Sequence, residues 1–357
     1  MRVLRINSII TVLSRNLSLL LILLVVATIF RNGFSLYGLR WKQFEAGRSG
    51  DFRCEYRDCG QLYIAHTVEE FGYRFGAAYY FIAYAIFLII SILIVVRQLS
   101  FLNYKTKIKV LVLFSYLPAS TIILQRFGTF DAIALMMSLI GVLSRTKFGA
   151  LLAAIISLGT NPEATIVSGA GLLLLIFFAR FGSEPRLKFT KNSLSFGFFQ
   201  VALSTPIILL SFFDNTGGSV VEAIFFVDST DALAQLIASG PLLIFSWFGS
   251  LWFVIFLIIR SFQSEIRFRT CLVIILIGAT TLVASDGTRN SALGLTSITV
   301  ALLLSNQGIK VVSNLSKNQL LALFAIPVIN IANFNIVLPF YQFLYLFDIA
   351  RPILVAN

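Results

Sequence analysis

The sequence has little charge, little histidine and little cysteine. Only 12% of its 357 residues are charged, whereas about a quarter is usual for a soluble domain. One histidine and three cysteines exclude most zinc sites built from His and Cys, because such sites need four well-spaced ligands. No glycine-rich phosphate loop or dinucleotide fingerprint is present, so the sequence does not indicate an ATP-driven pump.

Apolar residues take the place of the missing charges. The chain is 58% hydrophobic, contains 35 phenylalanines and has a mean hydropathy of +0.89. A soluble core cannot bury this much apolar surface, because surface area grows too fast relative to volume. The composition therefore predicts an all-α fold, a polytopic transmembrane helix bundle forming a single integral membrane domain over residues 1–357.

Apolar runs divide this domain into about eleven expected spans, since a span needs about 20 residues. We place them near residues 9–30, 75–96, 108–124, 128–144, 148–162, 164–179, 193–213, 236–259, 270–286, 290–305 and 319–340.

The net charge of +12 supports one orientation of these spans. With the N-terminus in the cytoplasm, inner segments hold 18 of the 28 basic residues and only two acids. Basic inner loops are what membrane insertion requires, so we expect a multi-pass protein of a bacterial inner (plasma) membrane. No basic run is interleaved with base-stacking aromatics, so we expect no nucleic-acid partner.

Two outer loops are expected, at residues 31–74 and 213–235. In the first loop, Cys54 and Cys59 face an oxidising compartment and form either a disulfide or two free thiols. The same loop repeats apolar residues at helical spacing from Ile64 to Phe75. That pattern fits either an amphipathic helix on the outer membrane surface or the first turns of the second span.

Three short outward turns carry charges at membrane depth, where charge is expensive. They are Gln125–Asp131, Gly159–Glu163 and Asp286–Asn290. Taken singly, each acid is explained as a helix-start residue favoured by the helix dipole, and each arginine by snorkelling to headgroups. Taken together, two arginines and three carboxylates at one membrane face indicate a site.

The residue types suit transfer of a sugar from a lipid phosphate. Arg126 and Arg289 are candidates to bind the phosphate, because a guanidinium donates paired hydrogen bonds to it. A carboxylate at the edge of a low-dielectric region can act as general base. The candidate catalytic residues are Asp131, Glu163, Glu69 and Glu70, with Asp286 and Tyr73 in support. A divalent metal is compatible with this chemistry but not required by it, and no acidic pair has a recognisable metal spacing.

The stretch from Phe127 to Glu163 resembles the core of GT-C type membrane glycosyltransferases. Such enzymes often show a Gly-x-Phe-Asp turn, as in Gly128-Thr129-Phe130-Asp131, followed by an apolar span, a basic inner turn and a small-residue span ending in a polar turn. The resemblance covers about a third of the chain and implies a polyprenyl-phosphate-linked sugar as donor. The chain departs from the family in lacking an acid between the first span and Glu45, where the family's usual base lies.

Two other functions stay open at this level. A transporter or flippase for a lipid-linked or anionic solute predicts a polar path with charges in mid-span, and the spans hold few. A non-catalytic membrane assembly subunit predicts that the outer charges pair locally rather than converge.

The orientation is testable by thiol labelling. A cysteine introduced beside Asp286 is expected to react with a membrane-impermeant maleimide added outside intact cells, whereas one beside Lys188 reacts only after the cells are opened. The reverse labelling pattern would place the three turns in the cytoplasm.

Overall fold

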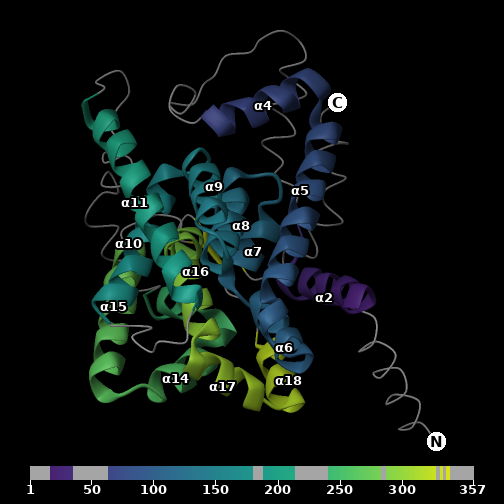
Figure 1. The fold of residues 1–357 in the computed structure, drawn as a ribbon. Coiled ribbons are helices and arrows are strands. Elements are labelled where there is room, and N and C mark those ends of the chain that lie inside the picture. Colours follow the sequence, from purple (N-terminus) through teal and green to yellow (C-terminus); the bar gives the residue numbers. More distant parts are fainter. Residues whose placement is uncertain are drawn as a thin grey trace, which may run out of the picture.

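The computed structural model describes residues 17–34, 63–179, 188–213, 240–282, 287–326, 330–332 and 335–337. These residues form a helical assembly with one short strand pair (Figure 1). In chain order the elements are α2 (Leu17–Asn32), α4 (Tyr63–Phe75), α5 (Ala77–Gln98), η2 (Leu99–Phe101), α6 (Tyr104–Ser115), α7 (Pro118–Gln125), α8 (Phe130–Leu143), α9 (Lys147–Leu158), α10 (Pro162–Phe177), α11 (Lys188–Phe213), η3 (Gly249–Leu251), α14 (Trp252–Arg260), α15 (Ser264–Leu282), α16 (Gly287–Leu304), α17 (Asn306–Asn314), α18 (Lys317–Ala325), β1 (Asn330–Ala332) and β2 (Asn335–Val337). Most of the two expected outer loops lies outside the described residues.

The described helices support a membrane protein but not the eleven predicted spans. Two helical stretches are long and apolar enough to cross a bilayer, Ala77–Phe101 and Asn192–Leu209. Three bent pairs raise the number to five if each pair forms one span: α6 with α7, Gly240–Ser246 with Gly249–Arg260, and Ser291–Leu304 with α17. The apolar helices α8, α9 and α10 have 14, 12 and 16 residues, fewer than the roughly 20 that a straight span needs.

The last expected span, 319–340, does not form one helix. The helix α18 ends at Ala325, and Ile326 is already extended, with φ −69° and ψ 123°. Pro327 follows in the sequence, and the residue before a proline is disfavoured in the helical region. Beyond it β1 pairs with β2 in antiparallel register, with Ile331 opposite Ile336. The apolar composition of this segment was therefore a poor guide to its conformation.

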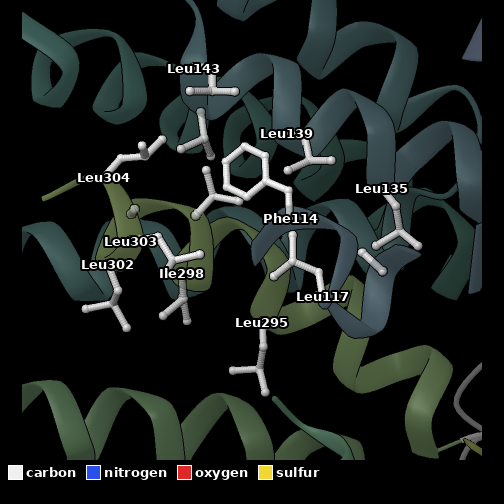
Figure 2. Close-up of a cluster of buried hydrophobic side chains, with 14 of the residues drawn as sticks. Phe114, Leu117, Leu135, Leu139, Leu143, Leu295, Ile298, Leu302, Leu303 and Leu304 are labelled. Carbon is white, nitrogen blue, oxygen red and sulfur yellow. The ribbon is translucent and has the colours of Figure 1, made fainter. Parts of the chain in front are cut away.

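The helix α8 lies at the centre of the assembly. All of its residues from Asp131 to Leu143 are buried, and it packs against α5, α7, α9, α11 and α16. Figure 2 shows Leu135, Leu139 and Leu143 of α8 gathered around Phe114, with leucines of α16 closing the cluster. Because lipid tails are as apolar as leucine, close packing rather than escape from water has to hold such a helix in place within a bilayer.

The helices α10 and α16 run parallel and in register. Gly294 faces Val167, and Ser168 Oγ lies 2.6 Å from Ser297 Oγ. A Cβ added at Gly171 would lie 2.9 Å from Ile298, so the helices approach closely here. Residues later in α10 contact residues later in α16, so the two helices run in the same direction. Both therefore begin at the same end of the assembly.

The helix α8 begins at that end too. Asn161, directly before α10, donates a hydrogen bond to Asp131 in the first turn of α8. At the opposite end of α8, Ser193 near the start of α11 donates to the carbonyl of Val142. We call the end where α8, α10 and α16 begin the amino end, and the opposite end the carboxyl end.

Basic side chains cap helices, whose last carbonyls have no donor within the helix. Arg145 donates to the carbonyl of Gln98 at the end of α5, and Arg269 to that of Phe178 after α10. The carbonyls at the end of α14 accept from Arg267, and Lys109 donates to Ser313 and Leu315 around the end of α17. Cations at helix C-termini are stabilising, because the helix dipole is negative there. Basic residues that were predicted to lie in inner loops therefore also donate hydrogen bonds to carbonyls at helix ends.

Candidate functional site

The turn between α7 and α8 is fixed by hydrogen bonds from α5. Tyr80 donates to the carbonyl of Gly128 over 2.5 Å, and Tyr84 donates to the carbonyl of Thr129 over 3.0 Å. Gly128 has φ 101°, a conformation that favours glycine, and Phe81 fills the space that a Cβ would need. The Gly128-Thr129 segment therefore has one defined shape, set by one face of α5.

Aromatic rings surround the same turn. The ring centroid of Phe127 lies 4.8 Å from that of Tyr84, 5.2 Å from that of Phe34 and 6.2 Å from that of Phe81. Edge-to-face and offset pairs at these separations are attractive. The cluster packs the residue next to Arg126 and so limits the positions open to that arginine's backbone.

Asp131 is the central side chain of the site. It is only 4% exposed, lies in the first turn of α8 and accepts a hydrogen bond from Asn161 Nδ2 over 3.0 Å. The start of a helix favours a carboxylate, because the backbone N–H groups there are unpaired and the dipole is positive. A buried carboxylate needs such partners, since removing a charge from water is costly.

Asn161 joins the turn at residues 125–131 to the turn at residues 159–163. Its Oδ1 accepts from the backbone N–H of Ala164 over 3.0 Å, which caps α10, while its Nδ2 reaches Asp131. Thr165 donates to the carbonyl of Asn161 and lies 2.8 Å from Ser157 Oγ, so this turn is held from both sides. One amide group therefore couples the starts of α8 and α10. Its sequence signal is weak, because an asparagine before Pro-Glu reads simply as a helix cap.

The start of α16, which follows the third predicted turn, is brought to the same end by the register of α16. Gly294 faces Val167, and five residues earlier on each parallel helix lie Arg289 and Pro162. The backbone of Arg289 is therefore level with the first residue of α10. Asp286 lies outside the described residues, and so does the side chain of Arg289.

The remaining predicted residues have varied placements. Arg126 is half-buried at the end of α7, and Glu163 lies in the first turn of α10, although its side chain is outside the description. On α4, Glu70 is half-exposed and forms an ion pair with the exposed Arg74. Tyr73 packs against Ala77, Tyr80 and Phe81. The side chain of Glu69 lies outside the described part of the structure, and so do the whole of Cys54 and Cys59. Within the described residues no group of three or more His, Cys, Asp or Glu side chains is placed to hold a metal ion.

Arg31 is a half-buried residue with several partners, and it was not among the candidates predicted from the sequence. Its guanidinium donates to the carbonyls of Phe324 and Ile326 and to Ser250 Oγ, and it lies 4.7 Å from the ring centroid of Tyr116. These bonds connect the end of α2 to the end of α18 and to η3. The sequence signal was an arginine directly after the hydrophobic segment that ends at Phe30, because a charge at membrane depth needs partners.

No family model, curated protein or solved structure matches the chain. The resemblance to GT-C type glycosyltransferases therefore rests on the short motifs quoted above. The geometry at the amino end stands independently of it: a buried carboxylate, a coupling amide and a half-buried arginine lie on adjoining turns.

Replacing Asn161 by aspartate tests the coupling between the turns. The variant keeps the oxygen that caps α10 but loses the donor to Asp131, which leaves a half-buried carboxylate facing the buried one. We expect the free energy of unfolding in detergent to fall by about 1–3 kcal/mol, and the loss to shrink at acidic pH, where a protonated carboxyl again donates.

Asn103→Asp is the matched control for this variant. Asn103 caps α6 in the same way, by accepting from the backbone N–H of Thr106, but it is exposed. It is expected to change stability by only a few tenths of a kcal/mol, since Asp and Asn cap about equally well. Equal stability losses in both variants would show that the contact between Asn161 and Asp131 contributes nothing.

Proposed function

We propose that this chain is a membrane glycosyltransferase that moves a sugar from a polyprenyl-phosphate carrier to an acceptor at the extracytoplasmic face. The observation that carries the proposal is the contact between Asn161 and Asp131 at the amino end, where α8, α10 and α16 all begin. A sugar-phosphate donor needs a base, a cation and anion-binding backbone close together, and this end supplies candidates for each.

The donor phosphate is proposed to bind between Arg126 and the helix starts. Helix N-termini bind phosphate because their unpaired N–H groups and dipoles favour negative charge, and arginine adds paired donors. Arg289 is the second candidate cation, since its backbone is level with the start of α10. The polyprenyl tail would lie along the lipid-facing apolar helices while the phosphate stays at the membrane edge.

Asp131 is the proposed general base. It accepts the proton of the acceptor hydroxyl as that oxygen attacks the anomeric carbon of the sugar. The bond between this carbon and the phosphate oxygen breaks, and its electron pair leaves with the polyprenyl phosphate. Asn161 orients the carboxylate through the 3.0 Å hydrogen bond. Glu163, in the first turn of the neighbouring helix α10, is the alternative base.

Transport of a lipid-linked or anionic solute is the second candidate function. Gln200 and Ser204 of α11 are fully buried, and neither the amide of Gln200 nor the hydroxyl of Ser204 has a hydrogen-bond partner. Unpaired polar groups inside an apolar assembly are costly and fit a path that a polar solute crosses. A transporter would move lipid-linked sugar between the leaflets of a vesicle without releasing polyprenyl phosphate.

Asp131→Asn is the direct test of the proposed reaction. The amide has nearly the shape of the carboxylate but cannot accept the acceptor's proton, so release of polyprenyl phosphate from a panel of polyprenyl-phosphate sugars should fall about 10²–10⁴-fold. Glu265→Gln is the control, because Glu265 is an exposed acid paired with Arg269 at the start of α15. Its turnover should equal that of the unaltered protein.

Full turnover by the Asp131→Asn variant would remove this residue from the reaction. Absence of turnover by the unaltered protein, with movement of labelled lipid between leaflets, would favour transport. Absence of both activities across the panel would favour a non-catalytic assembly subunit.

A further inference from the structure

The helix α4 is separate from the membrane span that follows it. It ends at Phe75, and α5 begins at Ala77 after Gly76, whose φ of 90° favours glycine. Figure 1 shows α4 turned across the upper end of α5 instead of continuing its axis. The choice left open by the sequence, between a surface helix and the first turns of the span, is thus decided in favour of a separate helix.

Large apolar side chains of α4 are exposed. Phe71 is 38% exposed and Phe75 52%, and their ring centroids lie 4.7 Å apart. Directly beyond the turn, exposed side chains continue into the span, with Tyr79 at 64% and Ile82 at 57%. The exposed apolar surface of α4 is therefore continuous along the chain with that of a helix long and apolar enough to cross a bilayer.

The opposite side of α4 faces the candidate site. Tyr73 packs against the cluster of Ala77, Tyr80 and Phe81, and Phe127 from the turn before α8 packs against the same cluster. Tyr80 in turn holds the carbonyl of Gly128. The charged Glu70 and Arg74 form their ion pair on a third, exposed side. The helix α4 therefore has three sides: one with the exposed rings of Phe71 and Phe75, one with Tyr73 packed against α5, and one with the ion pair of Glu70 and Arg74.

We propose that α4 is an interfacial helix, which inserts Phe71 and Phe75 into the headgroup–acyl boundary of a phospholipid leaflet while Tyr73 holds it against Ala77, Tyr80 and Phe81 of α5. An amphipathic helix next to a span binds the membrane surface in this way, because its rings leave water and its charges stay in it. The partner is the lipid surface itself. The inference concerns membrane contact alone and stands whether or not the chain transfers sugars.

Tryptophan placed on the two sides of α4 reports which side meets lipid. The full-length Phe75→Trp protein is reconstituted in phosphatidylcholine vesicles with and without lipids brominated on the acyl chains. Its fluorescence, after subtraction of the signal of the unaltered protein with its three tryptophans, should be quenched by bromine and blue-shifted. The matched variant Arg74→Trp, at the neighbouring exposed position, should instead be quenched by aqueous iodide.

Phe71→Trp is the second reporter, in case Phe75→Trp does not fold, and it should behave as Phe75→Trp does. Iodide quenching of the tryptophans at positions 71 and 75 would place this side in water and overturn the proposal. Shielding from both quenchers would overturn it too, because a protein partner or a second copy would then cover the rings.

Discussion

The parallel packing of α8, α10 and α16 is the constraint on which the rest of the structure depends. Three helices that start at one end place their positive dipole ends side by side, which is unfavourable unless negative groups lie nearby. Asp131 supplies negative charge at the start of α8, and Asn161 caps α10 while holding that carboxylate. The opposite poles are balanced in the same way, since Arg269 donates to the carbonyl of Phe178 after α10.

The same packing explains why polar residues occur inside so apolar a chain. Ser168 and Ser297 pair between α10 and α16, and Gly169 lets α11 approach until a Cβ there would lie 2.9 Å from the carbonyl of Gly197. Small side chains allow such close contact, and in a bilayer close contact replaces the hydrophobic effect as the source of stability. A site built at the end of these helices inherits their rigidity.

Much of this architecture was predictable from the sequence, and the failures have physical causes. Composition predicted a helical membrane protein, and the turns at residues 125–131 and 159–163 were located correctly because Gly, Pro and Asn interrupt apolar runs. The number of spans was not predictable in the same way. Hydropathy does not distinguish a helix that faces lipid from a short helix buried in protein, and α8 is of the second kind.

Side-chain partners were the least predictable feature. The sequence indicated Asp131 as a candidate, because a charge at membrane depth is energetically costly. Its hydrogen-bond partner, Asn161, lies 30 residues away and is identified only by tertiary structure. Arg31 is a similar case, because the carbonyls that accept its hydrogen bonds belong to residues 324 and 326. Charge at membrane depth marks where a contact must exist, whereas the identity of the contact follows from packing.

Disulfide trapping between α10 and α16 tests the parallel register most directly. In the double variant Ser168→Cys with Ser297→Cys, the two sulfurs replace oxygens that lie 2.6 Å apart. Iodine oxidation in membranes, followed by peptide mass spectrometry, should find these two cysteines linked, whereas Ser168→Cys paired with Ser291→Cys should stay reduced. A link from position 168 to position 291, or no link to 297 in folded protein, would contradict the register and with it the meeting of the three helix starts.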